Sequence, residues 1–225
     1  MPLETRSKNV PKDARPLILL GAGGHAKVVV SLVNALGRKF EGVCDSLLVQ
    51  AQSSIWRGLN VLGDDSALER FDPQQFELVL GFGPKPYSTR RAEVFNDLVN
   101  RGYHLPSLIH PSAFIDSTSA VHDGAQIMAG AVIQADCLIG QNAVVNTSAS
   151  VDHDTVIGRD AHIAPGAILC GGVKIGVGAF VGASATVLPQ VEIGANSLVA
   201  AGSTLARALA DDEVFCPHRL NSATS

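Results

Sequence analysis

Aliphatic residues recur at every sixth position through the second half of the chain. An amphipathic helix repeats its apolar positions every 3.6 residues and a hairpin strand every two, so a period of six predicts short strands that meet at regular corners. Three such hexapeptides form one triangular coil of a parallel β-helix, in which each aliphatic side chain stacks on its equivalent one coil away. The series runs Ile109, Ile115, Val121, Ile127, Ile133, Ile139, Val145, Val151, Ile157, Ile163, Leu169, Ile175, Val181, Val187, Ile193, Val199 and Leu205.

A second series, of small or short-branched residues, lies two positions before the first. We expect both series to point inward, with the small residues where the chain bends near a corner. With three hexapeptides in each coil, the run from residue 109 to residue 205 makes roughly five coils. Neighbouring coils should lie about 4.8 Å apart. The members are Ala113, Ser119, Ala125, Ala131, Cys137, Ala143, Ala149, Thr155, Ala161, Ala167, Val173, Ala179, Ala185, Val191, Ser197 and Ser203.

Residues 16–105 follow a different pattern. PLILLGAGGHAKVVVSLVNALG (16–37) predicts a buried strand, a glycine turn and an amphipathic helix, and FEGVCD (40–45) and FELVLGFG (76–83) predict two further strands. STRRAEVFNDLVNRG (88–102) predicts a second helix. Alternating strands and helices indicate a small Rossmann-like parallel α/β domain. We therefore divide the chain into a flexible tail (1–15), this domain (16–105), a β-helix (106–205) and a C-terminal extension (206–225).

Composition and charge narrow the class of partner. The chain has 225 residues and a formal net charge of −4, which argues against a nucleic-acid surface and favours a small-molecule partner. The four cysteines show no C-x-x-C spacing, and the amino terminus lacks the apolar run of a signal peptide. No run approaches the roughly 18 apolar residues of a membrane span. We expect a cytoplasmic protein without membrane insertion.

The glycine turn after the first strand predicts a phosphate-binding loop. Gly21, Gly23 and Ala26 match G-x-G-x-x-A, in which backbone N–H groups approach a diphosphate at the positive end of a helix. Gly24 and His25 follow at the first helical turn, where a phosphate or sugar would lie. The same residues also fit a plain strand-to-helix turn with a histidine that contacts only backbone.

Asp45 closes the second predicted strand, 24 positions after Gly21. Its carboxylate could accept hydrogen bonds from a ribose or a base at that edge of the sheet. Because a complete NAD domain needs more strands than about 90 residues supply, a nucleotide-sugar diphosphate fits better.

Four segments resemble the NeuD/PglD-type sugar acyltransferases, and the resemblance extends from about residue 16 to residue 205. They are GAGGHAKVV (21–29), NTSASVDHDTVIG (146–158), HIAPGAILCGGVKIG (162–176) and IGANSLVAAGST (193–204). The resemblance implies a left-handed β-helix, a nucleotide-sugar site in the amino-terminal sheet, homotrimers, and acetyl-CoA in the groove between neighbouring β-helices.

The resemblance also assigns roles to site residues. It implies that His153 is the general base and that Asp154 orients it, although Asp152 is equally close in sequence and Asn146 could support the ring. A histidine merely solvated between two aspartates is the alternative. It further implies that acetyl-CoA is contacted by His162 at the thioester and, along the pantetheine, by Gly171, Gly172, Gly182, Ala201 and Gly202, although glycines also serve as plain corner residues. No metal is implied.

Two segments depart from the family pattern. Ser148 stands where the family has glycine after Asn-Thr, and Cys216-Pro217-His218-Arg219 replaces a Gly-x-Pro-Ala-Lys-like segment near the CoA adenine. His104, His110, His122 and His218 show no partnering pattern, and we expect surface or linker roles for them.

The resemblance, together with these patterns, implies an acetyl-CoA-dependent N-acetyltransferase. Its acceptor would be a nucleotide-activated 4-amino sugar used in a surface glycan. The alternatives are an O-acetyltransferase of a sialic-acid-like sugar and a non-catalytic nucleotide-sugar-binding trimer. A dehydrogenase is disfavoured by the short sheet.

Overall fold

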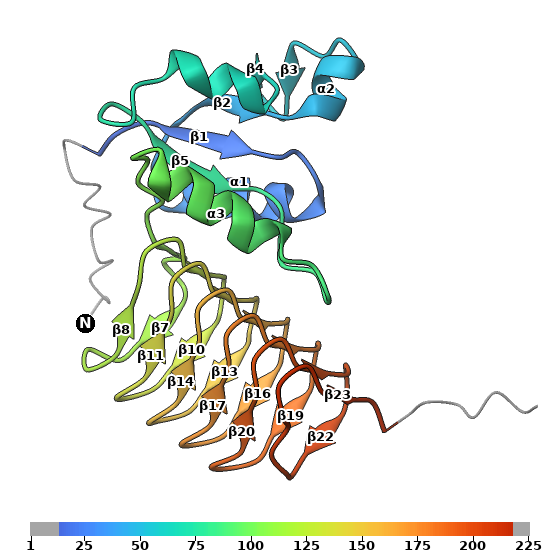
Figure 1. Ribbon diagram of the computed structural model, residues 1–225. Coiled ribbons are helices and arrows are strands. Elements are labelled where there is room, and N and C mark those ends of the chain that lie inside the picture. Colours follow the sequence, from blue (N-terminus) through green and yellow to red (C-terminus); the bar gives the residue numbers. More distant parts are fainter. Residues whose placement is uncertain (1–13, 218–225) are drawn as a thin grey trace, which may run out of the picture.

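The computed structural model describes residues 14–217, which form an amino-terminal α/β domain stacked on a β-helix (Figure 1). The sheet of the α/β domain has the strand order β3-β4-β2-β1-β5, with the β3–β4 pair antiparallel and the other pairs parallel. Its elements are β1 (Leu17–Leu20), α1 (Gly24–Ala35), β2 (Phe40–Cys44), α2 (Ser46–Gln50), β3 (Ile55–Trp56), β4 (Leu59–Gly63), the 3-10 helix η1 (Asp65–Arg70), β5 (Glu77–Leu80) and α3 (Arg90–Asn100).

Both faces of this sheet are covered, which explains the unbroken apolar run of β1. Leu17 and Leu19 pack with α1 on one face, whereas Ile18 and Leu20 pack with Phe95 and other α3 residues on the opposite face. A central parallel strand that is buried on both faces has no polar alternation. The sequence correctly predicted β1, β2, β5, α1 and α3. It did not predict α2, the β3–β4 hairpin or η1.

The β-helix consists of three parallel sheets, which we call faces I, II and III. Face I contains β7 (Phe114–Ile115), β10 (Val132–Ile133), β13 (Ser150–Val151), β16 (Ile168–Leu169), β19 (Thr186–Val187) and β22 (Thr204–Leu205). Face II contains β8 (Ala120–Val121), β11 (Leu138–Ile139), β14 (Val156–Ile157), β17 (Lys174–Ile175) and β20 (Glu192–Ile193). Face III contains β6 (Leu108–Ile109), β9 (Gln126–Ile127), β12 (Val144–Val145), β15 (His162–Ile163), β18 (Phe180–Val181), β21 (Leu198–Val199) and β23 (Val214–Phe215).

The predicted six-residue ladder forms the core of the β-helix. Ile133 pairs with Val151, and Val151 with Leu169, so each inward aliphatic residue stacks on its equivalent one coil away. The small residues of the second series are buried in the same cluster, as Ala143 and Ala161 illustrate. Both inward series are therefore confirmed.

The ends of the chain differ from the predicted boundaries. Within the segment set apart as a C-terminal extension, β23 pairs with β21 and Leu209 bridges to Ile193, so residues up to 215 continue the β-helix. At the amino end, the expected tail lies mostly outside the described residues. Its last member, Arg15, forms an ion pair of 3.1 Å with Glu77.

The α/β domain rests on the outer side of face III. Gln126 of β9 donates from Nε2 to the Leu80 carbonyl at 3.0 Å, and Arg159 donates to Oδ1 of Asn96 at 2.6 Å. Met128 and Val144 extend the apolar cluster under α1. Part of face III is thus covered by the α/β domain of the same chain.

Candidate active site

A histidine–aspartate pair lies at the corner that follows face I. Nδ1 of His153 lies 2.7 Å from Oδ2 of Asp154, whose φ of 59° is left-handed and turns the carboxylate back toward the ring. Aspartate is one of the few residues that adopt this conformation readily. Asp152 instead accepts from the His153 backbone N–H at 2.9 Å. Of the two aspartates beside His153, only Asp154 contacts the imidazole.

The electrostatics of this corner favour the charged form of the imidazole. The hydrogen bond to Asp154 raises the pKa of His153 above its ordinary value, and the charge of Asp152 adds to the effect. When Nδ1–H donates to a carboxylate, the lone pair of a neutral ring is on Nε2. With 60% of its side chain exposed, His153 is open to a substrate.

Gly171 lies one coil beyond His153 and leaves room for the ring. A Cβ at Gly171 would lie 2.7 Å from both Cε1 and Nε2 of His153, closer than Cβ contacts allow. The neighbouring Gly172 has a φ of 70° and donates its N–H to the His153 carbonyl at 2.8 Å. Gly171 and Gly172 were predicted to contact the cofactor, and each has a structural reason to be glycine in addition to that predicted role.

The remaining predicted pantetheine contacts lie near a different corner, the one that follows face III. A Cβ at Gly182 would lie 2.5 Å from the Ala201 nitrogen, so close stacking of coils requires glycine there. Ala201 and Gly202 are exposed, and Gly202 has a φ of 66°. Asn146 lies at the same corner, directly after β12, and its Oδ1 accepts from the Thr147 N–H at 2.8 Å, whereas His153 follows face I.

His162 points outward from face III but does not lie on the free surface. The α/β domain covers it to 7% exposure, and its ring stacks on Phe180 with centroids 4.7 Å apart. Burial, together with the charges of His25 and Arg91, lowers its pKa to about 3, so the ring is neutral. Its Nδ1 has no hydrogen-bond partner among the described residues.

The glycine loop between β1 and α1 is partly open. Gly21 has a φ of 90° and faces Phe82, so its conformation requires glycine. Gly23 and Gly24 have negative φ and are exposed, and a Cβ at either would meet nothing within 4 Å. Neither the backbone nor the packing requires glycine at these two positions, which leaves room for a ligand beside the amino end of α1.

Asp45 and His25 were predicted to contact the substrate, but in the structure both side chains form hydrogen bonds within the protein. Asp45 caps α2 by accepting from the N–H groups of Leu47 and Leu48, and its other oxygen accepts from the Ala22 N–H at 2.8 Å. It therefore holds the glycine loop against α2. His25 turns toward the β-helix, and its Nε2 lies 2.7 Å from Oε1 of Gln126.

The contact of His25 with Gln126 leaves the ring largely buried. Burial outweighs the Gln126 hydrogen bond and lowers the pKa of His25 to about 4. A Cβ at Gly83 would lie 3.2 Å from Nδ1 of His25, so the loop after β5 closes over the ring. His25 thus joins the two domains rather than facing an open phosphate site.

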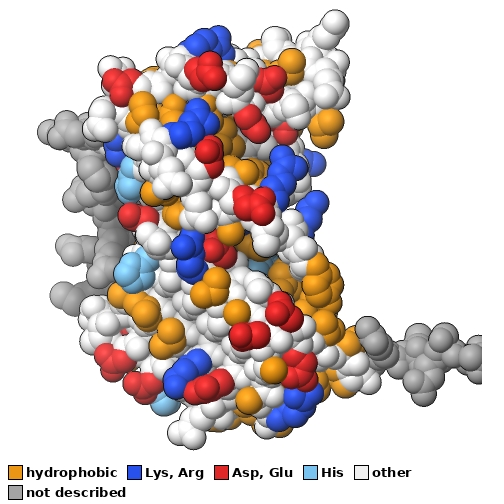
Figure 2. All heavy atoms as spheres, in the orientation of Figure 1, with side chains coloured by type: hydrophobic (Ala, Val, Ile, Leu, Met, Phe, Trp, Pro, Cys, Tyr) orange, Lys and Arg blue, Asp and Glu red, His pale blue; other side chains and the backbone are white. Residues whose placement is uncertain are grey.

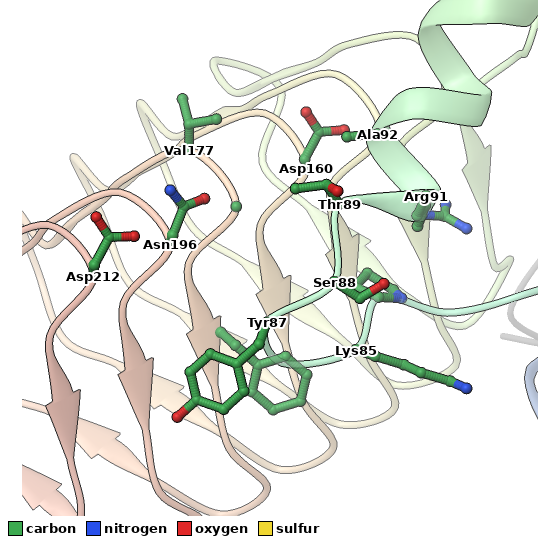
Figure 3. Close-up of a pocket in the computed structure, with 13 residues that line it drawn as sticks. Lys85, Tyr87, Ser88, Thr89, Arg91, Ala92, Asp160, Val177, Asn196 and Asp212 are labelled. Carbon is green, nitrogen blue, oxygen red and sulfur yellow. The ribbon is translucent and has the colours of Figure 1, made fainter.

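A cavity of about 470 Å³ separates the start of α3 from the β-helix, and sequence reasoning missed it (Figure 3). It is lined by Lys85, Tyr87 and Arg91 of the α/β domain and by Phe180 and other β-helix residues. In the sequence Arg91 reads as a surface residue of an amphipathic helix. Only the packing of the two domains buries it, so no local signal could have revealed this site.

Within residues 14–217, no three His, Cys, Asp or Glu side chains gather as a metal site requires. None of the helices in this range is long and apolar enough to cross a membrane.

Two family descriptions match parts of the chain. Residues 16–98 match the PglD N-terminal domain, and residues 172–207 match the bacterial transferase hexapeptide repeat. No curated protein matches the chain in sequence.

Solved structures resemble most of the chain. A histidine-to-asparagine variant of perosamine N-acetyltransferase from Caulobacter crescentus, in complex with CoA and GDP-perosamine, is 34% identical with a TM-score of 0.81, over 88% of this chain and 92% of that one. The acetyltransferase domain of PglB from Neisseria gonorrhoeae, in complex with acetyl coenzyme A, is 32% identical with a TM-score of 0.82, over 89% and 95% of the two chains. WeeI from Acinetobacter baumannii shares the fold at 18% identity and a TM-score of 0.77, over 89% and 96%. The predicted fold class, a Rossmann-like domain followed by a left-handed β-helix, is confirmed.

Proposed function

Because the chain belongs to the family of hexapeptide-repeat sugar acetyltransferases with a PglD-type amino-terminal domain, we propose that it acetylates the 4-amino group of a nucleotide-linked sugar with acetyl-CoA. The relative from Caulobacter crescentus binds CoA together with GDP-perosamine. The PglB domain binds acetyl coenzyme A. An amine acceptor on a nucleotide sugar is therefore favoured over the free hydroxyl of a sialic-acid-like sugar.

The observation that carries this proposal is the exposed His153–Asp154 pair. Nε2 of His153 takes a proton from the acceptor nitrogen as that nitrogen attacks the thioester carbonyl. The C–S bond then breaks, the acetyl group stays on nitrogen as an amide, and CoA leaves as the thiol. Asp154 holds the tautomer that keeps Nε2 free and stabilises the imidazolium that forms.

Gly171 supplies a second contribution beside the imidazole. Its backbone N–H has no acceptor among the described residues, and its Cα lies next to the His153 ring. A backbone N–H at this position is available to stabilise the oxyanion of the tetrahedral intermediate. The absence of a Cβ lets the imidazole lie directly against this backbone, which supports a role for Gly171 beside the reacting thioester.

The nucleotide end of the acceptor binds at the glycine loop. Gly23 and Gly24 leave the amino end of α1 uncovered, and that end favours anionic phosphate. Asp45 contributes by fixing the loop through Ala22, and His25 by fixing the start of α1 against Gln126. The substrate contacts predicted for these two side chains are thus replaced by positioning roles.

The working form is a homotrimer. The α/β domain covers part of face III, but faces I and II expose outer apolar side chains, and Figure 2 shows such side chains over the β-helix half of the surface. Phe114 is 52% and Ile168 45% exposed on face I, and Leu138 is 39% and Val156 38% exposed on face II. Such a patch is typical of an interface with a further copy. Sedimentation should give about three times the 23.4 kDa chain mass, and a clean monomer would remove the groove proposed for acetyl-CoA.

The function itself is tested by thiol release from acetyl-CoA. The panel contains UDP- and GDP-linked 4-amino sugars, the same nucleotides without an amino sugar, and free sialic acids. We expect thiol release with at least one nucleotide-linked amino sugar and none with the bare nucleotides. Release only with sialic acids would assign O-acetylation instead, and a panel without any release would refute the enzyme assignment.

A further inference from the structure

The loops after β1 and β5 lie side by side at the carboxyl edge of the α/β sheet. The strand order β3-β4-β2-β1-β5 places β2 on one side of β1 and β5 on the other, and Leu20 pairs with Leu80 at the ends of β1 and β5. The helix after β1 packs on one face of the sheet and the helix after β5 on the opposite face, so the two loops lead in different directions (Figure 1). Ligands of open α/β sheets bind outside the carboxyl ends at such a reversal of strand order. The loop after β5 therefore borders the nucleotide site proposed at the glycine loop.

The loop after β5, residues 81–83, packs directly on the glycine loop. A Cβ at Gly81 would collide with the Gly21 carbonyl oxygen, and a Cβ at Gly21 would lie 3.1 Å from Cδ1 of Phe82. The Phe82 carbonyl accepts from Nη1 of Arg91 at 2.6 Å, which fixes this loop to the start of α3. Phe82 therefore joins the glycine loop to the start of α3.

Arg90, the first residue of α3, lies over the Phe82 ring. Its Cζ is 5.6 Å from the ring centroid, within the range of a cation–π contact. Because the same ring touches Gly21, this contact holds the guanidinium near the glycine loop. A guanidinium has the planar, forked geometry that matches a phosphate group.

Arg90 is exposed and forms no ion pair within residues 14–217. The first carboxylate of α3, that of Glu93, accepts from Oγ1 of Thr89 at 2.6 Å instead. Other arginines pair with a carboxylate or donate to a backbone carbonyl, namely Arg15, Arg38, Arg70, Arg91, Arg101, Arg159 and Arg207. The charge of Arg90 is therefore available to an anion.

The glycine loop has no cation of its own for a diphosphate. Residues 21–26 contain neither lysine nor arginine, and burial lowers the pKa of His25 to about 4, so its ring is neutral. The amino end of α1 carries only the partial positive charge of a helix dipole, which offsets part of the charge of a diphosphate. Arg90, beside the neighbouring loop, is placed to offset the remainder.

The position of Arg90 indicates which phosphate it contacts. The glycine loop lies between the loop after β2 and the loop after β5. The loop after β5 is the one that continues toward the β-helix, since Gly83 lies against His25 and His25 forms a hydrogen bond with Gln126. The sugar has to leave toward a β-helix, because the general base His153 lies on one. The phosphate that carries the sugar is therefore on the side of β5, beside Phe82 and Arg90.

We propose that Arg90 binds the β-phosphate of the nucleotide sugar, the phosphate that carries the sugar, while the amino end of α1 binds the rest of the diphosphate. The inference rests on the proposed function and adds to it the side chain that recognises the substrate as a diphosphate. Arg90 is thus a substrate-binding residue. Phe82 is a positioning residue, because its ring holds the guanidinium at the glycine loop.

The test is calorimetric titration of the full-length protein with UDP, UMP, GDP and GMP. For the nucleoside whose diphosphate binds, Arg90→Gln should weaken the diphosphate about 10- to 100-fold, because a charge-assisted contact with phosphate is lost. The affinity for the monophosphate should stay close to that of the wild type, since the monophosphate lacks the group that Arg90 contacts. Arg90→Lys should recover part of the affinity for the diphosphate, because lysine keeps the charge without the planar fork.

Two matched controls remove an exposed arginine elsewhere in the α/β domain. Arg101→Gln removes a guanidinium that also lies 5.6 Å from an aromatic centroid, that of Tyr103, but at the carboxyl end of α3. Arg57→Gln removes the same charge from the turn before β4, at the amino edge of the parallel strands. Both variants should bind the diphosphate as the wild type does.

Wild-type affinity of Arg90→Gln for the diphosphate, or a wild type that binds none of the four nucleotides, would overturn the inference. An equal loss of monophosphate affinity would also overturn it, because it would indicate a displaced glycine loop. Thiol release with an unchanged KM for the nucleotide sugar in Arg90→Gln would refute the Arg90 contact and leave the acetyltransferase function standing. Diphosphate binding that depends on Arg90, in a wild type that releases no thiol, would support the contact and refute the function.

Discussion

Oδ2 of Asp154 lies 2.7 Å from Nδ1 of His153, and the left-handed backbone of Asp154 directs the carboxylate to that nitrogen. Nε2, on the other side of the ring, lies beside Gly171, where a Cβ would be only 2.7 Å away. The pair therefore has one nitrogen held and one nitrogen free, the arrangement that a general base requires.

Replacing His153 with alanine should abolish most activity without unfolding the protein. The side chain is exposed and contributes no core contact, so the melting temperature should stay close to that of the wild type. Loss of a general base typically lowers kcat by about 10²- to 10⁴-fold. Steady-state thiol release and acetyl-CoA binding measure this, and a variant with wild-type kcat at neutral pH would refute the mechanism.

The pH dependence of the reaction rate should reveal the hydrogen bond between Asp154 and His153. Because the raised pKa of His153 keeps the imidazole protonated to higher pH, the rate should rise as pH increases through a value above 6.5. Asp154→Asn removes the largest cause of that shift and should move the rising limb to lower pH while reducing kcat less than His153→Ala does. An unchanged limb in Asp154→Asn would show that His153 does not control the profile.

Gly171→Ala should reduce activity by displacing the imidazole. Gly171 has no left-handed φ, so alanine fits the backbone, but its Cβ would lie 2.7 Å from Nε2 of His153. A double-mutant cycle with His153→Ala tests this cause. We expect a kcat loss of at least about tenfold in the wild-type background and little further loss in the His153→Ala background. Equal losses in both backgrounds would point to an effect unrelated to the ring.

Gly24→Val should abolish binding of the nucleotide diphosphate while preserving the fold. A side chain at Gly24 meets no protein atom, and valine disfavours a helix no more than glycine does. The added methyl groups would instead occupy the space beside the amino end of α1. Calorimetry with the diphosphate measures the loss, and unchanged acetyl-CoA affinity is the internal control. Normal diphosphate binding would place the phosphates elsewhere.

The six-residue ladder predicts that two neighbouring residues contribute very different amounts to the free energy of unfolding. Ile175 is 3% exposed inside the coil, so Ile175→Ala should lower the free energy of unfolding by about 2 to 5 kcal/mol. Lys174, the residue before it, is exposed and forms only a surface ion pair with Glu192, so Lys174→Ala should cost less than about 1 kcal/mol. Chemical denaturation measures both, and similar losses would contradict the inward–outward alternation.

The sequence by itself determined the β-helix almost completely. A period of six specifies which residues of each coil point inward, and stacking of identical phases fixes the register, since Ile133 can meet Val151 in only one alignment. The same local logic identified β1, the glycine turn and α1, because a strand, a turn and a helix each depend on residues close in the chain. His153 was singled out by the resemblance of NTSASVDHDTVIG (146–158) to the family.

The sequence pattern could not predict which side chains form hydrogen bonds with each other within a turn. Asp152 and Asp154 are equally near His153 in sequence, and only the left-handed φ of Asp154 decides between them. In the same way, Asp45 reads as a ligand-binding carboxylate until its oxygens are seen to accept from Ala22 and Leu47.

The tertiary structure alone decided what lies between the two domains. His25 meets Gln126, which is 101 positions away in the chain, and the α/β domain buries His162 and Arg91, although each reads as a surface residue in its own segment. Burial and unpaired polar atoms at such a junction depend on how two separately folded units pack. A local repeat carries no information about that packing, so the cavity beside Arg91 appears only in three dimensions.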